Sequence, residues 1–164
     1  MLFTGNFTHY VDASGRLSLP AAFREKITNK DIRSRRRHQN IFLIPCRATK
    51  PTSAASKPYS GSKSEKRTQE ANVLICVPHD KMLEHQESIF EVFPKYLQVE
   101  RVPVFEVARE ISITEEGRIT LPYGLLNHLS TESDEPAQNS KRIKSVDVVG
   151  WGAVFAIEKH DRKH

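Results

Sequence analysis

The sequence predicts an α+β fold, mainly β, in which two related halves each combine short strands with one short helix. The first observation is a repeat, because VDASGRLSLP at residues 11–20 returns as ITEEGRITLP at residues 113–122, 102 residues later. The second observation is that two apolar, β-rich runs follow each copy. These runs are IFLIPCR (41–47) and NVLICVP (72–78) after the first copy, and SVDVVGW (145–151) and AVFAIEK (153–159) after the second.

Each copy of the repeat is typical of a strand, a tight turn, a second strand and a short amphipathic helix. The matching positions are Val11/Ile113, Gly15/Gly117, Arg16/Arg118, Leu17/Ile119, Ser18/Thr120, Leu19/Leu121 and Pro20/Pro122. Gly15 falls where a tight turn often requires a left-handed φ, and the Asp12 carboxylate can accept N–H groups of that turn. Leu17 alternates with Ser18, which predicts one inward face. Pro20 predicts the first helical position, because apolar residues spaced i, i+4 follow it.

The paired apolar runs predict two β-hairpins. The second hairpin closes tightly, with Gly150 and Gly152 at its tip. The first carries an insertion at residues 48–70, rich in Ser, Lys, Pro and Gly, which predicts a mobile basic loop at the tip. A polar insertion at 130–142 interrupts the second half.

The two halves are predicted to be residues 1–93 and 94–164. Residues 79–93, at the end of the first half, have apolar side chains at roughly helical spacing. The segment from there to Arg109 contains two prolines and is also predicted to be helical. Helices therefore join two mainly β halves.

The net charge of +5 comes from one part of the chain. Residues 30–70 hold eleven Lys/Arg and three Asp/Glu, a balance of +8, which leaves about −3 for the remainder. The arginine run Arg35, Arg36 and Arg37 is open to two interpretations, as phosphate contacts or as a solvated connector. Phosphate contacts would make DNA binding steeply salt-dependent.

Patterns of enzyme or metal chemistry are weak. Cys46 and Cys76 lie in apolar runs without metal-ligand spacing, which favours buried thiols over a disulfide or a metal pair. No two of His9, His79, His85 and His160 have HxxxH or HExxH spacing, and no phosphate-cradling glycine loop or nucleophile motif is present, so no cofactor, metal or catalytic site is predicted. Phe3, Phe7 and Tyr10 are predicted to pack in the core or at a subunit interface rather than to stack on bases.

Arg16 and Arg118 are the residues of the repeat that turn and strand geometry do not require. One interpretation pairs each arginine with a nearby carboxylate, which for Arg16 is Asp12. In the other interpretation, each turn displays a guanidinium that binds phosphate or the edge of a guanine base. In the second copy Thr114 stands where the acid was, and two glutamates that would repel phosphate flank the turn, yet Arg118 is kept.

Three stretches resemble the MraZ family, whose members carry two Asp-x-x-Gly-Arg motifs in two related halves. They are MLFTGNFTHYVDASGRLSLPAAFRE at the N-terminus, GRITLPYGLL, and VDVVGWGAVFAIEKHDR, so that the resemblance covers nearly the whole chain apart from the insertions. It implies a duplicated swapped-hairpin (AbrB-like) β-barrel with pseudo-two-fold related halves. The residues it implies in DNA binding are Asp12, Gly15 and Arg16 of the complete first motif, Arg24 of the FRE that follows that motif, and Gly117 and Arg118 of the second motif. Arg118 is expected to bind DNA more weakly than Arg16.

The resemblance implies a bacterial transcriptional regulator, cytoplasmic and nucleoid-associated, with no membrane and no small-molecule substrate among its partners. It would bind short repeats of double-stranded DNA upstream of a cell-division and cell-wall gene cluster that includes its own gene, as a ring-shaped homo-oligomer. The alternative is a non-enzymatic oligomeric assembly module whose DNA affinity is incidental to the basic loop.

Overall fold

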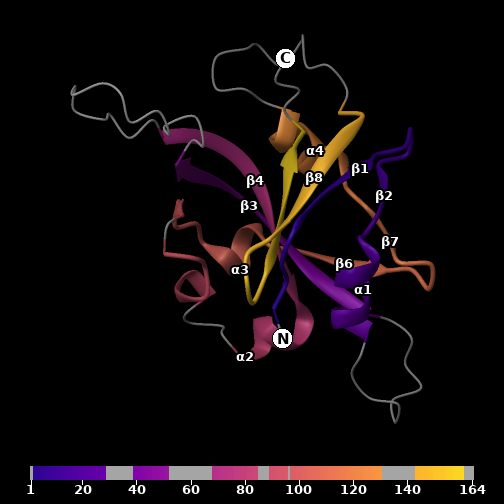
Figure 1. The fold of residues 1–164 in the computed structure, drawn as a ribbon, viewed down its shortest axis with the longest axis horizontal. Coiled ribbons are helices and arrows are strands. Elements are labelled where there is room, and N and C mark those ends of the chain that lie inside the picture. Colours follow the sequence, from indigo (N-terminus) through magenta and orange to yellow (C-terminus); the bar gives the residue numbers. More distant parts are fainter. Residues whose placement is uncertain are drawn as a thin grey trace, which may run out of the picture.

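The computed structural model of the chain describes residues 2–28, 39–51, 68–84, 89–95, 97–130 and 143–160, and it is mainly β with a few short helices (Figure 1). The strands are β1 (Asn6–Tyr10), β2 (Arg16–Ser18), β3 (Gln39–Pro51), β4 (Thr68–Pro78), β5 (Gln98–Val99), β6 (Arg109–Ile113), β7 (Arg118–Thr120), β8 (Ser145–Gly150) and β9 (Phe155–Lys159). The helices are α1 (Ala21–Thr28), α2 (His79–Glu84), the 3₁₀ turn η2 (Ile89–Glu91), α3 (Val104–Val107) and α4 (Tyr123–Ser130).

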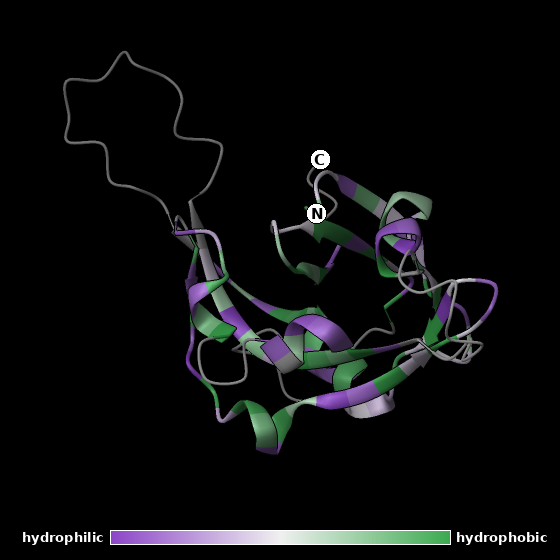
Figure 2. Cartoon of the chain, turned by 90° about the horizontal axis from the view of Figure 1, so that it is seen from below, coloured by the Kyte–Doolittle hydropathy of each residue, from purple (hydrophilic) through white to green (hydrophobic). Residues whose placement is uncertain are grey.

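Seven strands form one antiparallel sheet, and β2 and β7 form a separate two-stranded ribbon. The sheet order is β1-β8-β9-β4-β3-β5, and β6 also pairs with β3. Figure 2 shows that this sheet is strongly curled. Both predicted hairpins are confirmed, as β3 with β4 and as β8 with β9.

Strands from the two predicted halves alternate across this sheet. β1 pairs with β8 of the second hairpin, and β6 pairs with β3 of the first, so each half gives its leading strand to the hairpin of the other. The ribbon register follows the same exchange: Leu17 faces Ile119, its own counterpart in the repeat. The boundary predicted at residue 93 therefore separates segments of sequence that share one sheet.

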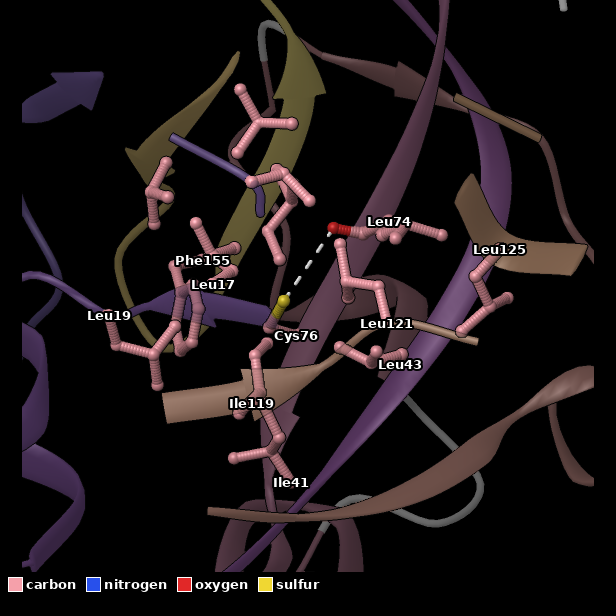
Figure 3. Close-up of a cluster of buried hydrophobic side chains, with 14 of the residues drawn as sticks. Leu17, Leu19, Ile41, Leu43, Leu74, Cys76, Ile119, Leu121, Leu125 and Phe155 are labelled. Atoms are coloured by element: carbon pink, nitrogen blue, oxygen red, sulfur yellow. Dashed lines mark hydrogen bonds between the residues drawn. The ribbon is translucent and has the colours of Figure 1, made fainter. Parts of the chain in front are cut away.

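The sheet is buried on both faces, which explains the nearly continuous apolar run of β4. Leu74 and Cys76 face a cluster that includes side chains of the ribbon and of α4 (Figure 3). Phe23 of α1 belongs to the same cluster. Val73, Ile75 and Val77 face a second cluster, which the segment from α2 to α3 covers. The ribbon is thus held against the sheet by its own apolar side.

The predicted helices are confirmed around the repeats and only partly between them. Helix α1 starts one residue after Pro20, and α4 starts one residue after Pro122. Within 79–93, α2 and η2 are helical. The helix predicted from there to Arg109 is wrong, because this segment holds β5, the one-turn α3 and the start of β6. Its apolar residues cover the second sheet face without forming a continuous helix.

The first insertion is shorter than predicted. Strand β3 continues to Pro51 and β4 starts at Thr68, so both ends of the predicted loop at 48–70 belong to the hairpin. Ala48 is fully buried there, since a small side chain fits under the covering segment. Residues 52–67 lie outside the described part of the chain, as do 131–142 of the second insertion.

The two cysteines are free, buried thiols, as the sequence predicted. Cys46 and Cys76 belong to the two clusters on opposite faces of the sheet, which separates their side chains. Burial raises the pKa of Cys46 to about 12 and also raises the pKa of Cys76. Neither thiol is a reactive nucleophile in this environment.

Candidate nucleic-acid interface

The first turn of the repeat, residues 12–15, is organised by the carboxylate of Asp12. Its Oδ1 accepts the backbone N–H groups of Ser14 and Arg16, each at 2.9 Å. The Gly15 N–H donates to the Asp12 carbonyl at 3.0 Å. Gly15 has a φ of 81°, a backbone angle that residues with a side chain rarely adopt. The hydrogen bond from the Arg16 N–H is the largest cause that lowers the pKa of Asp12 below its ordinary value.

Arg16 both pairs with Asp12 and faces solvent. Its Nε donates to Asp12 Oδ2 at 2.9 Å, while its side chain remains 54% exposed. The ion pair that the sequence offered as one interpretation is therefore present. It uses one of the five guanidinium N–H donors, and within the described residues the terminal amino groups have no other partner. The pair fixes the direction of the guanidinium without consuming its outer edge.

The second turn, residues 114–117, has the same backbone and a weaker side-chain closure. The Thr114 hydroxyl accepts the Arg118 N–H at 3.0 Å, and the Gly117 N–H donates to the Thr114 carbonyl at 2.9 Å. Gly117 has a φ of 79°. The Arg118 guanidinium lies 3.4 Å from Glu116, with half of its side chain exposed.

The ribbon of β2 and β7 places both arginines on one exposed face. Leu17 and Ile119 are buried beneath it, and the residues on either side of each point outward. Arg16 lies opposite Thr120, and Ser18 lies opposite Arg118. The two arginines are therefore diagonal neighbours on the ribbon, with Cα atoms about 7–8 Å apart. We call the four outward residues, Arg16, Ser18, Arg118 and Thr120, the ribbon face.

Reciprocal hydrogen bonds tie the two turns to the ends of the ribbon. The Leu121 N–H donates to the Gly15 carbonyl at 2.8 Å, and the Leu19 N–H donates to the Gly117 carbonyl at 3.0 Å. A Cβ on Gly15 would lie 2.8 Å from the Leu121 carbonyl oxygen, so glycine is also needed for this close approach. Each turn is thereby held by the strand of the other half.

Arg24, which the resemblance implied in DNA binding, lies away from Arg16. It is half-buried on α1, and its Nη1 donates to the Glu116 carbonyl of the second turn at 2.9 Å. Burial lowers the pKa of His9 below its ordinary value, and the positive charge of Arg24 lowers it further. Asp12, Gly15 and Arg16 thus meet at one turn, whereas Arg24 joins Gly117 and Arg118 at the other.

The two turns carry as much negative as positive charge. Asp12, Glu115 and Glu116 provide three carboxylates, and the three positive charges are Arg16 and Arg118 of the ribbon face and Arg24 at the second turn. This balance of charge is unlike that of a phosphate-binding basic patch. The ribbon face instead presents a few oriented guanidinium N–H donors, with no excess of positive charge around them. Arg35, Arg36 and Arg37 lie outside the described residues.

Two residues of the ribbon face were seen in the sequence only as outward positions. The strand register makes Ser18 and Thr120 part of the candidate interface, because it places each of them opposite an arginine of the other half. The alternation of apolar and polar residues signalled their exposure, but no local pattern signalled the pairing. Among the aromatic residues, Phe3 and Phe7 pack against Phe23 in the core, as predicted, whereas Tyr10 is 82% exposed.

A cavity of about 430 Å³ lies between the first turn and α4. Apart from Asp12, which Arg16 already engages, its lining is the turn backbone with apolar and neutral polar side chains. Over the part of the chain that is described, no three His, Cys, Asp or Glu side chains come together as a metal site. Within the same residues, no helix has the length and apolarity needed to cross a membrane.

Searches with protein-family models and among curated proteins found no match to this chain.

Proposed function

We propose that the chain is a transcriptional regulator that binds double-stranded DNA in a sequence-specific manner through the ribbon face. The carrying observation is the placement of Arg16 and Arg118 on the exposed face of a two-stranded ribbon. The major groove admits such a ribbon, and an arginine that reaches guanine O6 and N7 is the commonest specific contact there. The neighbouring Ser18 and Thr120 add two hydroxyl groups and one methyl group beside the two guanidinium groups.

We further propose that the interleaved sheet is a duplicated swapped-hairpin, AbrB-like barrel. The exchange of leading strands between the halves supports this organisation, because each hairpin is completed by a strand from the other half. The resemblance to the MraZ family extends the proposal to a ring-shaped homo-oligomer that engages successive DNA repeats. Its targets would be short repeats upstream of a cell-division and cell-wall gene cluster, its own gene included.

Two parts of the chain would contribute to DNA binding in different ways. The ribbon face is nearly neutral together with its turns, so it reads bases more than it attracts phosphates. The attraction to the backbone comes from the basic stretch of residues 30–70, which carries the excess positive charge. Simultaneous binding by several subunits would strengthen each contact.

The direct test is binding of the purified protein to the DNA immediately upstream of its own gene. We expect affinity for this fragment to exceed affinity for a fragment of the same composition with scrambled repeats by at least about a thousandfold, the lower end for specific regulators. Both fragments are measured at the same salt concentration. Equal affinity for the two fragments would refute the proposed function.

A second candidate function is an assembly module with incidental DNA affinity, and the three carboxylates beside the ribbon arginines are the observation that favours it. The two candidates predict different results when the basic loop is removed. Pro51 and Thr68 face each other at the end of the hairpin, so residues 52–67 can be replaced by Asn-Gly, a sequence suited to a two-residue turn.

For a DNA-reading ribbon, we expect this replacement to weaken binding to specific and scrambled DNA in parallel and to preserve the ratio of the two affinities. The segment contains four Lys/Arg and one Glu, so the salt dependence becomes shallower by about 0.9 for each phosphate that the variant no longer neutralises. A full-length variant with the four basic residues changed to Ser separates charge from loop length. Complete loss of DNA binding in both variants would favour the assembly module.

A further inference from the structure

The two turns of the repeat are closed by different means. In the first turn, the Asp12 carboxylate accepts three hydrogen bonds, two from backbone N–H groups and one from the Arg16 side chain. In the second, the Thr114 side chain accepts one, from the Arg118 N–H. The second turn therefore lacks the contacts that hold its tip and its arginine in the first.

Arg24 occupies the place where this support is missing. A Cβ on Gly117 would clash with Arg24 Cδ, so the arginine stem passes directly over the glycine. The Arg24 Nη1 then donates to the Glu116 carbonyl at 2.9 Å. Glu116 in turn pairs with the Arg118 guanidinium at 3.4 Å, which links Arg24 to the arginine of the ribbon face.

The repeat offers an internal comparison for this contact. With the offset of 102 residues, Arg24 corresponds to Leu126 on α4. Leu126 lies under the first turn, where its Cδ1 is 3.2 Å from the Cβ position of Gly15. Each helix therefore supports the turn of the opposite half. At this matched helix position, the second turn, which lacks the Asp, receives a hydrogen-bond donor, and the first turn receives an apolar side chain.

We propose that Arg24 is a positioning residue that closes the second turn in place of the missing acid and thereby orients Arg118, and that it does not itself contact DNA. Its effect on DNA binding rests on the proposed function, whereas its effect on the turn does not. The contact lies between residues 92 positions apart, so it also couples the geometry of one repeat to the folding of the other.

The first experiment measures the turn without DNA. Arg24→Leu copies the residue that supports the first turn, so we expect the variant to fold. We expect solvent exchange of the Gly117 and Arg118 amides, followed by NMR, to become about three- to tenfold faster, as for the loss of one hydrogen bond. The Gly15 amide is the internal control and should not change. Arg24→Lys, which keeps a donor, should restore most of the protection. Unchanged exchange at Gly117 and Arg118 would overturn the proposal.

The second experiment measures DNA binding in a double-mutant cycle. If Arg24 acts through Arg118, then Arg24→Leu lowers specific affinity no further than Arg118→Ala, and the double variant binds like Arg118→Ala alone. A phosphate contact would instead multiply the two losses and reduce the salt slope by about one. Multiplied losses would overturn the positioning role. If the native protein shows no specific binding, the proposed function fails, and the exchange experiment still decides the role of Arg24.

Discussion

Changing Arg16 to alanine is expected, under the proposed function, to remove repeat-specific DNA binding while the fold and any assembly remain intact. A good bidentate contact to guanine contributes about 1–3 kcal/mol of discrimination, so each subunit loses about five- to 150-fold in preference for its site. In an oligomer that engages several repeats at once these losses multiply, and specific binding approaches the level for scrambled DNA.

The same substitution should cost little stability. The Asp12 carboxylate keeps its two hydrogen bonds from backbone N–H groups, because Ser14 is unchanged and an alanine in place of Arg16 still has its backbone N–H. The ion pair that the substitution removes is about half exposed, and exposed pairs of this kind contribute little to stability. Thermal unfolding and size-exclusion measurements should therefore match those of the native protein.

Arg109→Ala is the matched control, because Arg109 is exposed on β6, outside the ribbon face, and its loss changes the net charge equally. We expect it to lower affinity for repeat and scrambled DNA to the same small extent. If Arg16→Ala behaves like Arg109→Ala, or if it collapses the oligomer, the motif is structural and the ribbon face does not read DNA.

The first turn was predictable from sequence because its contacts are local. Asp12 and Gly15 close a turn within four residues, and alternation places Leu17 in the core. The contact of Arg24 was not predictable, because nothing near α1 indicates which distant carbonyl it meets. The resemblance assigned this residue to DNA, whereas its neighbour in the structure is a turn of the other half.

The same distinction explains the successes and errors in the fold. A hairpin such as β8–β9 is a local pairing, marked by Gly152 at its tip, whereas the pairing of β1 with β8 joins segments 139 positions apart at Thr8 and Asp147. The helix predicted up to Arg109 does not form, because the apolar residues of this segment follow no strict helical period. Their spacing reflects the sheet face that they cover, which exists only after distant strands have paired.

Phe23→Ala is expected to produce the largest loss of stability, about 3–5 kcal/mol, as for other buried Phe→Ala changes. Phe23 is fully buried on α1, with ring centroids at 5.2 Å from Phe3, 5.4 Å from Phe7 and 5.1 Å from Phe155. These partners lie before β1, on β1 and on β9, so one ring joins both ends of the described chain. Chemical denaturation monitored by circular dichroism measures the change.

Phe105→Ala is the matched control, because it deletes the same side chain where 72% of it is exposed. Its effect should stay within about 0.5 kcal/mol. Because the two halves share one sheet, Phe23→Ala should shift a single unfolding transition rather than divide it into two. A second transition that remains at the native midpoint would mean that the second half is stable without the first. In that case strand exchange does not hold the ribbon together, and the two arginines of the ribbon face would not be fixed relative to each other.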